Sequence, residues 1–125
     1  MTKIKNIDWW NNLPKDKDTN VVAVEGDNVV YIDGIAFLIQ RKNEWNNVVC
    51  WKVKTTKKDL VSIFAAFRAW CQKKQIQYIR VEGIGKHHYK MLYLVLRRSP
   101  ETTNIVYNPT ESAEYDRHIW YVKVY

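Results

Sequence analysis

The chain has 125 residues, of which 46% are hydrophobic, and this length and composition fit a single globular domain. Its 20 Lys and Arg residues exceed its 13 Asp and Glu residues, and the net charge of +7 favours acidic partners such as nucleic acid or an acidic protein face. The N-terminus lacks the apolar run of a signal peptide, and no stretch approaches the roughly 18 apolar residues of a membrane span, so we expect no membrane partner.

The aromatic share of 14%, with six Trp and eight Tyr, is more than a core of this size can hide, so some rings are expected to meet a partner. Cys50 and Cys71 both fall on expected core faces. We therefore expect two buried thiols rather than a disulfide.

The first half of the chain predicts a short N-terminal segment followed by three antiparallel strands. Residues 7–13 favour a short helix or turn ended by Pro14, within an N-terminal extension of residues 1–20. Gly34 interrupts the second strand, where we expect a bulge or a close backbone approach. The strands are expected at residues 21–25, 29–40 and 48–54.

The middle of the chain predicts a strand, a helix and a second, parallel strand. After the strand at 48–54, Thr56 begins a capping box closed by Asp59, which starts a helix. The chain then enters a strand at residues 76–82, so the unit is a right-handed βαβ crossover. Apolar residues at helical spacing give the helix one buried stripe: Leu60, Ile63, Phe64, Phe67, Trp70 and Cys71.

The last third predicts a second helix and two final strands. The helix spans residues 86–98, follows Gly83 and Gly85, and ends before Pro100. A short strand at 104–107 leads into a loop that starts at Asn108. Residues 116–125 form the final strand. The expected fold is thus a mixed α/β (α+β) domain with an antiparallel meander, a βαβ unit and two main helices.

This order of elements resembles the GCN5-related N-acetyltransferase (GNAT) fold over residues 21–125. Residues 29–38 look like the family's second meander strand, and residues 60–72 look like the helix behind its cofactor loop. Residues 81–93 look like the strand and helix where the family places its catalytic tyrosine. The resemblance implies that an active acetyl-coenzyme A-dependent N-acetyltransferase would use Tyr93, or Tyr89 in a different register, as its general acid.

The chain departs from the family at the loop that holds the cofactor. An active member carries Arg/Gln-x-x-Gly-x-Gly/Ala there, and its glycines let backbone N–H groups approach the pyrophosphate. Residues 54–59 contain no glycine, and Asp59 places a negative charge in the first helical turn. Residues 48–54 also lack the family's usual carboxylate base. We therefore expect no bound cofactor and no catalytic residue.

Basic residues at the two expected helix starts offer an anion-binding site or, as an alternative function, a nucleic-acid site. In a GNAT arrangement both helix starts lie on one face, at the split between the two central strands. A solvated basic rim is the simpler explanation. The candidate anion-binding residues are Lys54, Lys57, Lys58 and Lys86.

No metal site is expected. His87 and His88 are adjacent on a helix and point about 100° apart, so they cannot chelate one ion comfortably. His118 is isolated, and no Cys or acid stands at ligand spacing.

Four tryptophans outside the two amphipathic helices are candidate interface residues. Three of them lie in or beside loops, where they either anchor a partner or fold back over the sheet as a satellite core. The final strand, which ends at Tyr125, offers a sheet edge to a neighbouring subunit. The candidate interface residues are Trp9, Trp10, Trp45 and Trp120.

Degenerate GNAT-like domains without the glycine loop are found among bacteriophage proteins. One kind, the small internal virion protein of short-tailed coliphages, is similar to this chain in Val49-x-Trp51-x-Val53 and in Tyr78-x-Arg80-Val81-Glu82. The resemblance implies a non-catalytic structural or interaction protein. It would act in the host cytoplasm and then in the virion, with phage structural proteins or further copies of itself as partners.

Overall fold

The computed structural model describes residues 2–15, 20–42, 44–83, 104–115 and 118–125. Within these residues the chain is an α+β fold with seven strands and three helices. The strands are β1 (Thr2–Lys5), β2 (Asn28–Ile32), β3 (Ile35–Lys42), β4 (Trp45–Lys52), β5 (Tyr78–Gly83), β6 (Asn104–Tyr107) and β7 (His118–Lys123). The helices are α1 (Ile7–Asn11), α2 (Leu60–Lys73) and α4 (Pro109–Tyr115).

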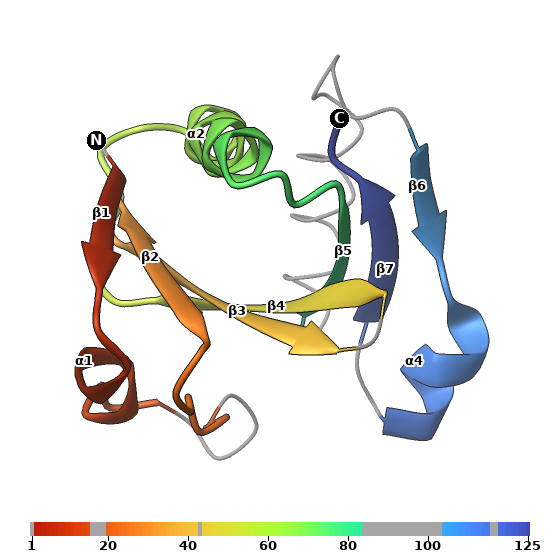
Figure 1. Cartoon of the computed structure of the whole chain (residues 1–125), viewed down its shortest axis with the longest axis horizontal. Coiled ribbons are helices and arrows are strands. Elements are labelled where there is room, and N and C mark those ends of the chain that lie inside the picture. Colours follow the sequence, from red (N-terminus) through yellow and green to blue (C-terminus); the bar gives the residue numbers. More distant parts are fainter. Residues whose placement is uncertain (1, 16–19, 43, 84–103, 116–117) are drawn as a thin grey trace.

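All seven strands form one sheet in the order β1-β2-β3-β4-β5-β7-β6. Helix α2 covers one face, and α1 and α4 lie against the other (Figure 1). Every neighbouring pair is antiparallel except β4 and β5, which are parallel and joined through α2. The expected βαβ crossover is therefore confirmed. The strand β4 pairs with β3 over its whole length but with β5 only through Asn46–Val49.

The expected single strand at 29–40 is wrong, because a tight turn divides it into β2 and β3. Asp33 and Gly34 both have positive φ, at 42° and 91°, as a two-residue type I′ hairpin requires. The turn reverses the chain, and Ile32 pairs with Ile35. An Asp-Gly pair between apolar runs is a strong hairpin signal, and Gly34 lies in a hairpin turn rather than a bulge. The other alternative expected at Gly34, a close backbone approach, is confirmed, because a Cβ atom there would lie 2.6 Å from the Lys54 carbonyl oxygen.

The strand expected at 21–25 is also wrong, because side chains rather than a neighbouring strand hold this segment. The Asn11 side chain donates to the Ala23 carbonyl at 3.0 Å and accepts from the Ala23 N–H at 2.8 Å. The Trp10 indole N–H donates to the Val21 carbonyl at 2.7 Å. The edge beside β2 is taken instead by β1, so the N-terminal extension supplies an edge strand of the sheet.

Helix α2 begins one turn later than expected. Asp59, not Thr56, is the N-cap, and its carboxylate accepts from the Ser62 N–H at 2.7 Å. The expected apolar stripe is confirmed, since it packs into the core between α2 and the sheet. Phe67 stacks on Phe37 of β3, with ring centroids 4.3 Å apart.

A second, smaller core lies on the opposite face of the sheet, under α1. Trp10 is fully buried there, packed with Val29, Leu38 and Val49 of three adjacent strands. Because Trp10 also bonds to Val21, it fastens both α1 and the following segment to the sheet.

The C-terminal region differs from the expected loop and edge strand. The loop that was expected from Asn108 is helix α4. The final strand β7 lies between β5 and β6, so it is not the sheet edge we expected. The helix expected at 86–98 lies outside the described residues.

Both cysteines are free, as expected. Cys71 is buried and Cys50 packs against the same core. Burial raises the pKa of each thiol to about 12, so both stay protonated near neutral pH.

Removing the Phe67 ring tests this packing. Phe67→Ala should lower the free energy of unfolding by about 3–5 kcal/mol, because the ring is buried and its loss leaves a cavity. Gln72→Ala, an exposed position on the same helix, should change it by less than about 0.5 kcal/mol in the same denaturant titration. A loss below ~1 kcal/mol at Phe67 would contradict the burial of this face.

Candidate functional site

The loop between β4 and α2 is the first candidate site, and its backbone donors already hold an anion. The Asp33 carboxylate, from the β2–β3 turn, accepts from the N–H groups of Lys57 and Lys58 at 2.9 Å and 2.6 Å. The pKa of Asp33 lies below its ordinary value, chiefly because the Lys58 N–H donates to the charged form, with the Lys57 N–H and the Lys58 charge adding to it. An internal carboxylate therefore occupies the amides that an external anion would need.

The backbone of the same turn is also locked against the end of β4. The Gly34 carbonyl accepts from the N–H groups of Val53 and Lys54, at 2.7 Å and 3.3 Å. A Cβ atom at Gly34 would lie 2.6 Å from the Lys54 carbonyl oxygen, and φ at this position is +91°. Only glycine permits this close approach, which holds Asp33 beside the loop.

The electrostatics of this loop combine exposed lysines with two engaged carboxylates. Lys54, Lys57 and Lys58 lie close together in sequence, and all three are exposed. Asp33 and Asp59 each accept loop or helix N–H groups at the start of α2. An incoming phosphate would meet lysine side chains at the rim but two negative charges at the backbone donors.

Other residues that were considered from the sequence for anion binding, acid catalysis or metal binding lie outside the described part of the chain. These are Lys86, His87, His88, Tyr89 and Tyr93. Within the described residues, no group of three or more His, Cys, Asp or Glu could hold a metal ion.

The predicted interface tryptophans have different environments. Trp10 and Trp120 are buried in the protein's own cores, so neither is available at the surface as an anchor. Trp9 is half-buried, packs edge-on against Tyr31, and has the Lys5 ammonium 5.3 Å from its ring centroid. Trp10 therefore belongs to a satellite core on the sheet, which was one of the two alternatives, and Trp9 packs partly against the same core.

Trp45 belongs to an aromatic cluster on the sheet itself. It is half-buried, with its ring centroid 5.4 Å from Tyr78 and 4.5 Å from Tyr121. The three residues come from β4, β5 and β7, so strand pairing brings together rings that are far apart in sequence.

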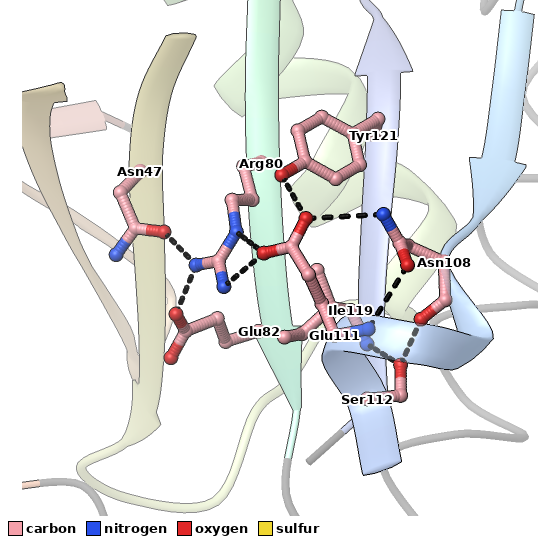
Figure 2. A network of polar contacts seen from close by, with 8 residues as sticks. All are labelled: Asn47, Arg80, Glu82, Asn108, Glu111, Ser112, Ile119 and Tyr121. Carbon is pink, nitrogen blue, oxygen red and sulfur yellow. Dashed lines mark hydrogen bonds and ion pairs between the residues drawn. The ribbon is translucent and has the colours of Figure 1, made fainter. Parts of the chain in front are cut away.

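A polar network is the second candidate site, on the face away from α2 (Figure 2). Arg80 of β5 lies at its centre and donates to Asn47 of β4 at 2.5 Å. It also donates to Glu82 on its own strand, and to Glu111 of α4 at 3.2 Å and 3.0 Å from two nitrogens. Glu111 in turn accepts from the Tyr121 hydroxyl of β7. The network thus connects three strands to α4.

Local capping explains why Glu111 reaches this network. Asn108 precedes Pro109, and its side chain accepts from the Glu111 N–H at 3.0 Å and donates to the Glu111 carboxylate at 3.0 Å. Asn108 is thus an N-cap, with proline at the first helical position, and its side-chain amide also holds the Glu111 carboxylate. Ser112 then accepts from the Ile119 N–H at 3.0 Å, which ties α4 to β7.

The charges in the network stabilise one another. Burial alone would lower the pKa of Arg80, but the hydrogen bonds and charges of Glu82 and Glu111 outweigh it and raise the value. The pKa of Glu111 is lowered, first by the Tyr121 hydroxyl and then by Arg80. Burial and Glu111 raise the pKa of Tyr121.

Sequence reasoning missed the residues that carry both sites, although each had a local signal. Asp33 belongs to an Asp-Gly hairpin pair. Arg80 and Glu82 alternate with the buried Ile79 and Val81, as on a strand with one polar face. Glu111 is the last residue of Asn-Pro-Thr-Glu, a helix-start signature.

Comparisons of the chain with protein-family models, with curated proteins and with solved structures found no match. Among the described residues, no helix is long and apolar enough to cross a membrane.

The network makes the docking of α4 dependent on pH. The lowered pKa of Glu111 means that its contribution is present above the ordinary value of 4.5 and is lost as the pH falls through the folded value. Near neutral pH, Glu111→Gln should lower the free energy of unfolding by about 1 kcal/mol or more. The difference from wild type should shrink as the carboxyl is protonated.

Denaturant titrations of both proteins between about pH 2 and pH 7 would measure this convergence. Glu114→Gln, an exposed position on the same helix, is the matched control and should leave stability nearly unchanged at every pH. A Glu111→Gln difference that does not vary with pH would contradict the role of the charged form.

Proposed function

We propose that this chain is a non-catalytic interaction protein with a GNAT-like fold, and that it builds or accompanies a bacteriophage particle. One observation carries the proposal: the Asp33 carboxylate fills the backbone amides of Lys57 and Lys58 in the loop where a GNAT enzyme would hold its cofactor's pyrophosphate. An enzyme of this family needs those donors free for the phosphates.

The strand arrangement supports the GNAT-like part of the proposal. The two central parallel strands, β4 and β5, pair only through the first half of β4, and the loop to α2 follows the half of β4 that β5 does not pair. In the family, a split between the two central strands is where the cofactor lies. The β4–α2 loop thus lies where the family's cofactor loop lies, but its residues differ from those that bind the cofactor.

The charge at this loop argues against an acyl-coenzyme A ligand. Binding it would require Asp33 to leave two short hydrogen bonds and would set the pyrophosphate close to a displaced carboxylate and to Asp59. The negative charges of the pyrophosphate and the two carboxylates would repel one another, and the hydrogen bonds that Asp33 loses would not be replaced. The lysine side chains offset only part of this cost because they are solvated.

Exposed apolar side chains on both outer strands support an interaction role. Ile4 of β1 is 63% exposed and Val106 of β6 is 50% exposed. Among the described residues, both strands have one side without a neighbour in the sheet, so each offers backbone donors and acceptors to another chain. The net charge of +7 favours a partner with an acidic face. The phage assignment rests on the resemblance of the sequence.

Calorimetric titration with acetyl-coenzyme A tests the non-catalytic part. The wild-type protein should give no binding in the low micromolar range. Asp33→Asn removes the charge while keeping the side-chain shape, and any weak affinity should rise in this variant but not in Glu44→Gln, an exposed control. Low-micromolar binding by the wild-type protein would refute the proposal and revive the acetyltransferase alternative.

Light scattering with and without phage structural proteins tests the interaction part. A complex should form with the wild-type protein and weaken in Ile4→Lys or Val106→Lys, because a charge replaces an exposed apolar contact. Gln72→Lys, at an exposed position on α2, is the control. A clean monomer that joins no phage structural protein would count against the interaction role.

A further inference from the structure

Strand pairing places two lysines and two aromatic residues in one line across the sheet. Lys42 of β3 pairs with Trp45 of β4, and Tyr78 of β5 pairs with Lys123 of β7. Trp45 and Tyr78 are joined by their ring contact. We call Lys42, Trp45, Tyr78 and Lys123 the basic aromatic row. It crosses four strands, about 14 Å from end to end.

The row lies on the face away from α2, where it reaches solvent. Residues alternate between the two faces of a strand, and Val48 and Ile79, at odd spacing from Trp45 and Tyr78, belong to the core under α2. Tyr78 is 41% exposed, Trp45 is half-buried and Lys42 is exposed. The exposed part of Tyr78 leaves an aromatic surface open to solvent.

The aromatic rings of the row are fixed before any ligand binds. Trp45 packs edge-on between Tyr78 and Tyr121, with interplanar angles of 69° and 81°. The Tyr121 hydroxyl is held by Glu111. A ligand that stacks on such a platform orders few side chains, so little binding energy is lost to entropy.

The charges beside the row favour an anionic ligand that runs along it. A lysine stands at each end, and Arg80 is the next residue inward from Tyr78 on the same face. Of the nearby acids, Glu82 and Glu111 are both bound by Arg80, and Glu44, which precedes Trp45, is exposed. Positive charge at the ends and aromatic rings in the middle match phosphates and bases, respectively.

We propose that the basic aromatic row binds single-stranded nucleic acid. Unpaired bases would stack against Tyr78 and Trp45, and the phosphates would lie near Lys42 and Lys123. A duplex hides its bases and could use only the lysines, so the row should prefer single strands. This inference does not depend on the proposed function, because the row lies at the other end of β4 from the Asp33 loop, about 23 Å along the strand.

Fluorescence anisotropy of a labelled oligothymidine and its RNA counterpart tests the proposal. The wild-type protein should bind both at low salt and bind a duplex of equal length more weakly. Tyr78→Ala should weaken single-strand binding about fivefold or more, the loss expected for one stacked base. Tyr78→Phe keeps the ring and should bind like the wild-type protein, which separates stacking from any effect on folding.

Two charge reversals locate the phosphate contact. Lys42→Glu should weaken binding, and Lys42→Gln should reduce the slope of log affinity against log salt by about 0.7, the value for one lost contact to a single strand. Lys57→Glu makes the same charge change at the start of α2 and should have little effect. The affinity of Lys57→Glu therefore shows whether nucleic acid binds at the row or at the start of α2.

Four results would overturn the proposal. These are no detectable single-strand binding at low salt, equal or tighter binding of the duplex, full affinity in Tyr78→Ala, and a loss in Lys57→Glu that matches the loss in Lys42→Glu. If the protein binds an acidic protein segment and not nucleic acid, and Tyr78→Ala removes that binding, the row is a protein interface. The nucleic-acid assignment is then wrong. None of these results bears on coenzyme A binding.

Discussion

The hydrogen bonds from Lys57 and Lys58 to the Asp33 carboxylate are the constraint on which the functional account depends. They join the β2–β3 turn to the loop before α2 and so fix where the crossover helix starts. They also neutralise loop donors that would otherwise attract an anion. The contact fastens two segments of the chain to each other, and Gly34 makes the close approach feasible.

The two faces of the sheet carry different kinds of residues. Under α2 the sheet is apolar, and stacked aromatic rings such as Phe37 and Phe67 fill the core. The other face carries a small core under α1, an ion-pair network that docks α4, and the half-exposed aromatic rings of β4, β5 and β7. On this face Trp45, Tyr78 and Tyr121 each keep part of their surface in solvent.

The sequence alone predicted the elements that depend on periodicity. The stripe of α2, the parallel pair around it and the last two strands follow from apolar spacing, because a buried face must repeat with its element. The errors came from short signals with special backbone geometry. Asp33-Gly34 was placed inside one long strand, with a bulge or a close backbone approach at Gly34, and only the close approach is confirmed. Asn108-Pro109 was expected to start a loop rather than to cap a helix. The polar network and the basic aromatic row depend on strand pairing, which places Arg80 beside Asn47 and Trp45 beside Tyr78 although more than thirty residues separate each pair. No local pattern contains that information.

An NMR pH titration of the Lys57 and Lys58 amide protons tests the central claim most directly. Because the pKa of Asp33 is lowered, its hydrogen bonds should persist above the ordinary value of 3.8 and weaken as the pH falls through the folded value. We expect both amides to resist hydrogen exchange at higher pH and to shift together with a midpoint below 3.8, and we expect Asp33→Asn to abolish that shift. Amides that exchange freely, or that titrate at or above 3.8, would contradict the claim that Asp33 occupies this loop.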